Sequence, residues 1–192
     1  MRVLHLLFLM CSFFTLAAQN EPQVSTTTNH KYSKRTVFGF KGGFNRSHVR
    51  GVEMDGDKTG YIGGELYGAF FCEKDLNARL ILEGELLFSW TNDYHFIEMP
   101  LHLKYLFSKK WAAFAGPKID YLVDAENSPP GPFYDLHKFG ISGELGVQYN
   151  FSRRLFAETR YARGLTSHVR DYFLDINKGK RDVFRVGLGI RF

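Results

Sequence analysis

The sequence predicts an all-β protein, an eight-stranded antiparallel up-and-down transmembrane β-barrel. Three observations predict this fold. From residue 36 onward apolar and polar residues alternate, the pattern of strands that have two different faces. The alternating segments are roughly nine to twelve residues long, the length that a tilted strand needs to cross a bilayer. Charged residues gather on only one of the two faces.

The eight segments follow one another along the chain and are separated by turns or loops. They are residues 36–44, 60–71, 80–90, 96–107, 111–122, 139–149, 155–165 and 183–192. Strands of globular proteins usually have about five or six residues. The greater length of these segments therefore favours strands that cross a membrane.

The composition of the 192 residues excludes several other classes of protein. With 44% hydrophobic and 16% aromatic residues, the chain is too apolar to be disordered. The glycines show no period of three, as collagen would, and two cysteines cannot support a disulfide scaffold. A membrane helix needs about 18 consecutive apolar residues, and none occur beyond the first twenty positions.

The start of the chain has the three parts of a secretory signal peptide. Arg2 supplies the positive charge, residues 3–16 are apolar, and Ala17 and Ala18 are the small residues of a cleavage site. Cleavage after either alanine fits the pattern. An uncleaved signal anchor is the alternative, and the short apolar stretch disfavours it.

We therefore predict three parts of the chain. They are a signal peptide over residues 1–18, a flexible periplasmic tail over 19–35 and an outer-membrane β-barrel domain over 36–192. Cleavage would remove Cys11, so that Cys72 could form no internal disulfide. The mild excess of basic residues suits an anionic lipid surface, and nucleic acid is not an expected partner of an exported chain.

One face of the segments is apolar, and the other carries seven acidic and six basic side chains. We predict that the residues of the charged face form an interior charge network. Its members are Glu65, Glu83, Glu85, Glu98, His102, Lys104, Lys118, Asp120, Glu144, Glu158, Arg160, Arg185 and Arg191, together with Lys41. The near balance of opposite signs would let these groups pair, as buried charges require.

Size and glycine content decide which face is inside. A soluble lipocalin-like barrel would turn the apolar face inward. An eight-stranded barrel has an interior just wide enough for side chains, and the large apolar side chains of this face would overfill it. Nine strand glycines lie on the charged face and six on the apolar face. Small residues are needed where space is short, so the charged face is predicted to be inside.

The connections between the segments alternate in length. The short ones are residues 72–79, 108–110 and 150–154, and the long ones are 45–59, 123–138 and 166–182. Only residues 91–95, on the side of the long ones, are tight. Outer-membrane barrels have short periplasmic turns and long extracellular loops. With an even number of strands, both ends of the barrel are then predicted to face the periplasm.

Five stretches resemble the PorT-like outer-membrane β-barrel family of Bacteroidetes. They are Phe40-Lys-Gly-Gly-Phe-Asn45, Ile97-Glu-Met-Pro-Leu-His-Leu-Lys-Tyr105, Ala115-Gly-Pro-Lys118, Glu158-Thr-Arg-Tyr-Ala-Arg-Gly-Leu165 and Gly187-Leu-Gly-Ile-Arg-Phe192. The resemblance implies a location in the outer membrane, but no activity. The C-terminal Phe192 is similar to the signal that outer-membrane assembly machinery binds, which implies a role in insertion. The family's namesake is an accessory component of a protein-secretion system.

Known catalytic and metal-binding motifs are missing from the sequence. It has no G-x-S-x-G, H-E-x-x-H, phosphate-binding Walker loop or paired C-x-x-C. His48, His95, His137 and His168 fall in separate predicted loops, where solvated histidines are common. We therefore predict no enzyme, no cofactor and no metal site, with an outer-membrane lipid-modifying enzyme as an alternative.

One predicted loop combines basic and aromatic residues that could bind the phosphates and sugars of lipopolysaccharide. These residues are Arg170, Tyr172, Phe173, Lys178, Lys180 and Arg181. Ordinary loop composition is the alternative explanation. The sequence thus predicts a structural or binding protein of the cell envelope with a closed polar core, exported to the cell outer membrane. The expected partners are outer-membrane lipid, lipopolysaccharide and the assembly machinery, with envelope or secretion proteins as a further alternative.

Overall fold

The computed structural model describes residues 35–52, 58–90, 94–125, 139–166, 169–171 and 176–192. The predicted signal peptide and nearly all of the predicted tail lie outside these residues. Within the described part of the chain, no helix is long and apolar enough to cross a membrane.

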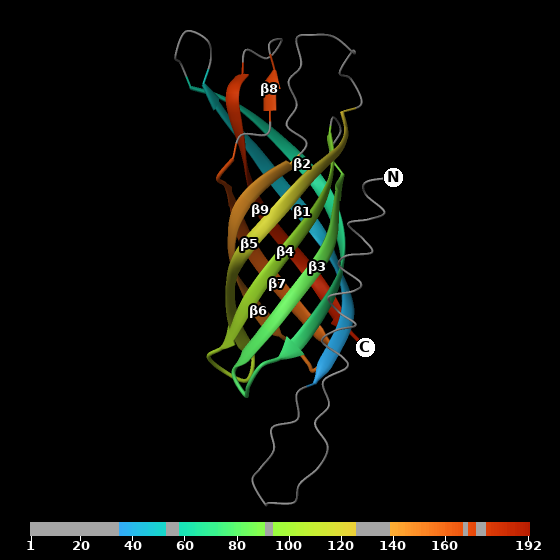
Figure 1. Ribbon diagram of the computed structural model, residues 1–192. Coiled ribbons are helices and arrows are strands. Elements are labelled where there is room, and N and C mark those ends of the chain that lie inside the picture. Colours follow the sequence, from blue (N-terminus) through green and yellow to red (C-terminus); the bar gives the residue numbers. More distant parts are fainter. Residues whose placement is uncertain (1–34, 53–57, 91–93, 126–138, 167–168, 172–175) are drawn as a thin grey trace, which may run out of the picture. The chain divides into compact units, whose positions relative to one another are not determined.

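Eight long strands form a closed barrel (Figure 1). They are β1 (Thr36–Val52), β2 (Lys58–Asp75), β3 (Leu80–Trp90), β4 (Tyr94–Leu106), β5 (Trp111–Ala125), β6 (Phe139–Asn150), β7 (Leu155–Gly164) and β9 (Ile176–Arg191). Each strand pairs antiparallel with the next one, and the short β8 (Val169–Asp171) pairs only with β9. The predicted fold class is therefore confirmed.

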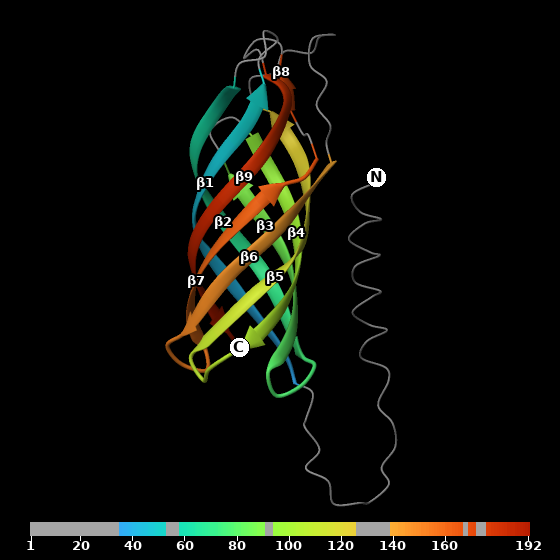
Figure 2. The same cartoon turned by 90° about the vertical axis from the view of Figure 1, so that its left-hand side faces the viewer.

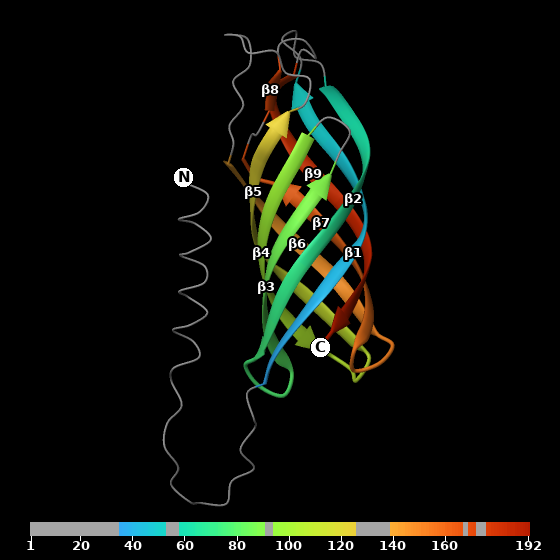
Figure 3. The ribbon, with the colours of Figure 1, turned by 90° about the vertical axis from the view of Figure 1, so that its right-hand side faces the viewer.

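Pairing between the first and last long strands closes the sheet. The β1–β9 register runs from Gly39 opposite Arg191 to Val52 opposite Asn177, with a shift between Arg50 and Val52. Figures 2 and 3 show that the strands tilt in the same sense around the barrel axis. Closure pairs both edges of the sheet. Within a bilayer, the backbone N–H and C=O groups of an unpaired edge could not form hydrogen bonds with water instead.

The apolar face of the strands points outward. Phe44 is 71% exposed and Leu145 is 61% exposed, whereas the side chain of Glu83 on the other face is fully buried. This is the reverse of a soluble protein, in which large apolar side chains are inside. An outward apolar surface is what a barrel in a lipid bilayer requires.

Three four-residue turns lie at one end of the barrel, which we call the turn end. They are residues 76–79, 107–110 and 151–154. In each turn the second residue, Asn77, Ser108 or Ser152, accepts hydrogen bonds through its side-chain oxygen from two following backbone N–H groups, at 2.9–3.2 Å. Asparagine and serine stabilise turns in this way, so the turns are encoded locally.

Away from the turn end, β1 and β9 extend well beyond the predicted segments, and β2, β4 and β5 extend by two or three residues. The predicted loop 45–59 is mostly strand, because β1 continues to Val52 and β2 begins at Lys58. Likewise β9 begins at Ile176 instead of Val183. The alternation of apolar and polar residues fades there, since outward positions such as Arg46 and His48 are polar, while the backbone pairing continues.

Candidate functional site: a buried charge network

Ionisable side chains fill the inside of the barrel. In the described part of the chain they comprise seven carboxylates, seven basic groups and one histidine. They are Glu73, Glu83, Glu85, Glu98, Asp120, Glu144 and Glu158, then Lys41, Lys104, Lys118, Arg160, Arg181, Arg185 and Arg191, and His102. All but Arg191 are buried, and even its side chain is only 13% exposed. The interior therefore contains balanced opposite charges.

The layer next to the turn end is built around Glu73 and Lys104. The Glu73 carboxylate accepts hydrogen bonds from Arg191 at 2.7 and 3.2 Å and from Lys104 Nζ at 3.0 Å. Lys104 also donates to Glu83 at 2.5 Å and to the side-chain carbonyl of Gln148 at 2.7 Å. Lys104 thus connects strand β4 with β2, β3 and β6.

The central layer places one ammonium group among three carboxylates. Lys41 Nζ donates to Glu85 at 2.6 Å, to Glu158 at 3.1 Å and to Glu83 at 3.2 Å. Arg160 Nη1 donates to both oxygens of Glu85, at 2.9 and 3.0 Å, from the opposite wall. Strands β1, β3 and β7 are therefore joined across the barrel axis.

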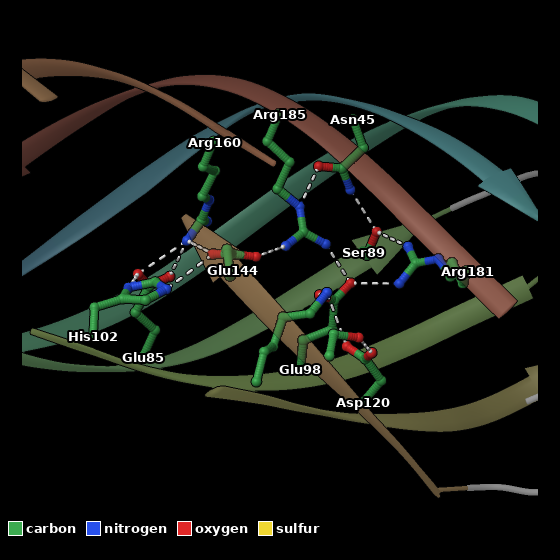
Figure 4. Close-up of polar contacts among 12 residues, drawn as sticks. Asn45, Glu85, Ser89, Glu98, His102, Asp120, Glu144, Arg160, Arg181 and Arg185 are labelled. Carbon is green, nitrogen blue, oxygen red and sulfur yellow. Dashed lines mark hydrogen bonds and ion pairs between the residues drawn. The ribbon is translucent and has the colours of Figure 1, made fainter. Parts of the chain in front are cut away.

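His102 lies in the same layer, between carboxylates. Its Nδ1 is 3.1 Å from Glu85 and its Nε2 is 3.1 Å from Glu144 (Figure 4). Its ring centroid is 4.9 Å from that of Phe114. With the side chain fully buried, this histidine is placed to bridge two carboxylates and not to meet a substrate.

The third layer lies furthest from the turn end and is centred on Glu98 (Figure 4). Its carboxylate accepts hydrogen bonds from Lys118 at 2.6 Å, from Arg181 at 2.9 Å and from Arg185. Arg185 also donates to Asn45 Oδ1 at 2.6 Å. One carboxylate here holds three cations from β5 and β9.

Two glutamates join the layers into one network. Glu83 accepts hydrogen bonds from both Lys41 and Lys104. Glu144 accepts from Arg160 at 3.0 Å and from Arg185 at 3.3 Å. The buried charges are thus connected from Arg191 to Arg181, along most of the barrel, and each desolvated charge has at least one partner of opposite sign, as burial demands.

Aromatic rings also occupy the interior. Lys41 Nζ lies 5.3 Å from the ring centroid of Phe71, and the Arg191 guanidinium carbon lies 4.4 Å from that of Phe156. These rings occupy the space where Gly39 and Gly189 would carry a Cβ atom. The glycines on the charged face therefore make room for inward rings as well as for charges.

The structure places twelve of the thirteen predicted network residues, and Lys41, in the interior. Glu65 belongs to β2, but its side chain is outside the described part. Glu73 and Arg181 also belong to the network, although both fall in predicted connections. Both lie on the charged face if the alternation is continued past the predicted strand ends, through Phe71 to Glu73 and through Val183 to Arg181.

The predicted lipopolysaccharide-binding loop requires correction. Arg181 is not a loop residue, because it is buried in β9 and donates to Ser47 at 3.2 Å as well as to Glu98. Lys178 and Lys180 also belong to β9, and Arg170 belongs to β8. The remaining two residues, Tyr172 and Phe173, lie outside the described part. The six residues therefore do not form one loop surface.

The two predicted loop histidines that the structure describes lie on different strands. His48 is an exposed residue of β1, and His95 is a half-buried residue of β4. His137 and His168 lie outside the described residues.

The C-terminal Phe192 donates its backbone N–H to Phe38 at 3.0 Å and is 66% exposed. Its role in assembly stays a prediction.

Among the described residues, one group of side chains has metal-ligand chemistry. Ligand atoms of Glu83, Glu85 and His102 lie within 4.8 Å of one another. However, Lys41 donates to both carboxylates, and Arg160 and Lys104 each bind one of them. Basic groups of this chain already neutralise the carboxylates, so the arrangement suits ion pairing better than a cation site.

Sequence and structure comparisons agree with this architecture. Residues 91–170 match a family described as outer membrane protein beta-barrel domain. This match spans 80 of the 192 residues, less than half of the chain. No curated protein matches it in sequence. The narrower PorT-like assignment stays a prediction.

Two solved barrels have a similar fold. Neisserial surface protein A is 13% identical, with a TM-score of 0.51 over 81% of this chain and 97% of that one. Ail, the attachment invasion locus protein of Yersinia pestis, is 10% identical, with a TM-score of 0.50 over 82% of this chain and 99% of that one. At these identities the similarity concerns the fold alone.

Proposed function

We propose that this outer-membrane barrel is a non-conducting structural or binding component of the cell envelope. The observation that carries the proposal is the continuous network of buried charges from Arg191 to Arg181. An eight-stranded barrel has an interior just wide enough for side chains, and here salt bridges and aromatic rings occupy it. Conduction would require several buried ion pairs to separate, each at a cost of several kcal/mol.

With the interior closed, the surfaces at the two ends of the barrel are available for binding. At the end opposite the turns, β1, β7 and β9 present basic groups on the outer wall. Arg50 donates to the Asp182 carboxylate at 2.5 and 3.0 Å, and Tyr161 donates to it at 3.2 Å. Arg46 and Arg163 are exposed nearby on β1 and β7. Such groups suit phosphates of lipopolysaccharide, which supports a binding role.

Two alternatives have less support. A role as an accessory component of a secretion or envelope complex rests on the sequence resemblance, and co-purification with large envelope proteins would favour it. A lipid-modifying enzyme would need an accessible catalytic group, but His102 is fully buried and paired, and the exposed His48 lies on β1, away from β4 with His95. Neither alternative explains the filled interior as directly.

Reconstitution into planar lipid bilayers tests the proposed closure. The unmodified chain is expected to give no steady ion conductance above that of the lipid, since salt bridges and aromatic rings occupy the described interior. A wide porin inserted into the same bilayer provides the positive control. Steady and reproducible conductance steps from the unmodified chain would contradict a closed core and favour a transport function.

A further inference from the structure

The three turns share a sequence pattern that repeats with their structure. Each begins with an apolar residue, continues with Asn or Ser and ends with a basic residue. The turns are Leu76-Asn-Ala-Arg79, Phe107-Ser-Lys-Lys110 and Phe151-Ser-Arg-Arg154. Since the Asn or Ser side chain fixes each turn through the same two backbone hydrogen bonds, a basic side chain leaves every turn from the same position.

Other basic residues complete a ring around this end of the barrel. We define the basic turn ring as seven exposed or half-exposed residues: Arg35, Lys74, Arg79, Lys109, Lys110, Arg153 and Arg154. Two acidic side chains are described at this end of the barrel. Glu73 points inward to Arg191 and Lys104, so that Asp75 is the one that faces solvent. The ring therefore has a strong positive excess.

Aromatic contacts place the ring at the depth of lipid headgroups. Arg79 Nη1 lies 3.5 Å from the hydroxyl of Tyr105, and Lys110 Nζ lies 5.9 Å from the ring centroid of Tyr149. Tyr149 in turn packs against Trp111, with ring centroids 4.8 Å apart. Tyrosine and tryptophan at the ends of membrane strands prefer the interface between hydrocarbon and water.

We propose that the basic turn ring binds the phosphate groups of anionic phospholipids in the periplasmic leaflet. Short turns of outer-membrane barrels face the periplasm, and lysine and arginine bind phosphate through charge-assisted hydrogen bonds. Five of the seven bases come from three turns spaced around the circumference, beside lipid-facing aromatic rings. This arrangement matches lipids that surround the barrel better than one protein docked on a single side.

Bound headgroups would hold the barrel at a defined depth in the membrane. The inference goes beyond the proposed function, because it depends on the turn end and holds whether or not the core conducts. Loss of lipid preference would leave the bilayer conductance result unchanged, so the two proposals can fail separately.

Native mass spectrometry of the full chain in detergent tests the proposal. With equal amounts of phosphatidylglycerol and phosphatidylcholine added at low salt, we expect phosphatidylglycerol to be retained about fivefold more often. The triple variant Arg79→Gln, Lys110→Gln, Arg154→Gln should reduce this preference to roughly twofold or less, because it removes one cation from each turn. Raising the salt concentration to about 0.5 M should weaken the preference of the unmodified chain, since exposed charges are screened.

A matched triple variant at the other end of the barrel provides the control. Arg46→Gln, Arg163→Gln, Lys180→Gln removes the same charge and should lower the preference less than the turn variant does, because it leaves the seven bases of the ring intact. Heat-modifiable migration on a detergent gel verifies that both variants fold. Equal retention of the two lipids by the unmodified chain, or equal loss of preference in the two variants, would overturn the proposal. Retention of a glutamate-rich peptide without any lipid preference would assign the ring to a protein partner and also overturn it.

Discussion

Replacing Glu98 with alanine is expected to destabilise the barrel by about 3–5 kcal/mol. The Glu98 carboxylate is fully buried and accepts hydrogen bonds from Lys118, Arg181 and Arg185. Its removal leaves three desolvated cations around a gap, with fewer carboxylates to neutralise them. The free energy of unfolding, measured by denaturant titration of the barrel in lipid vesicles, gives the loss directly.

The control for this variant is Asp75→Ala at the turn end, where the carboxylate is partly exposed. This substitution should change the free energy of unfolding by no more than about 0.5 kcal/mol, as is usual for surface sites. A change of less than about 1 kcal/mol for Glu98→Ala would mean that water reaches the cations, which the close packing of the network excludes.

Replacing Gly116 with alanine is expected to destabilise the barrel by about 1–3 kcal/mol through overpacking. Gly116 lies on the inward face of β5, and a Cβ atom there would overlap the backbone carbonyl oxygen of Leu101 on β4. A backbone oxygen held in a sheet cannot rotate away as a side chain can. The same denaturant titration measures the effect.

Gly143 offers a matched comparison on the neighbouring strand β6. A Cβ atom there would meet no atom within 4 Å. Gly143→Ala should therefore be neutral or stabilise the barrel slightly, since glycine within a strand costs about 0.5–1 kcal/mol relative to alanine. Equal effects of the two substitutions would show that interior space does not explain the glycines of the charged face.

The fold was predictable because the bilayer imposes a simple rule on the residues inside it. β3 has the predicted bounds, Leu80–Trp90, since large apolar residues take most of its outward positions while Glu83, Glu85 and Ser89 point inward. The outer parts of β1, β2 and β9 were missed because, beyond the bilayer, both faces of a strand can be polar. The length of these outer parts depends on pairing with neighbouring strands, and this pairing cannot be predicted from the sequence of one strand alone.

The members of the charge network were largely predictable from alternation, but their partners were not. Arg160 on β7 binds Glu85 on β3 across the barrel, and the register of five strands decides such a contact. The inward rings of Phe71 and Phe156 were not predicted, because the two faces of the strands were distinguished by their charged residues. Phe71 lies two residues before Glu73 and Phe156 lies two residues before Glu158, so alternation places both rings on the charged face. The glycines opposite these rings were the feature of the sequence that could have indicated them.

The central claim is that the charged face is inside and the apolar face meets lipid. Spin labels on single cysteines at Leu145 and Leu188, in a Cys72→Ser background, test it most directly in barrels reconstituted in vesicles. Both side chains are 58% exposed or more on the outer wall. We expect oxygen, which concentrates in lipid, to relax both labels more strongly than a water-soluble nickel complex does. Stronger relaxation by the nickel complex at both positions, or protection from both reagents, would contradict a lipid-facing apolar wall.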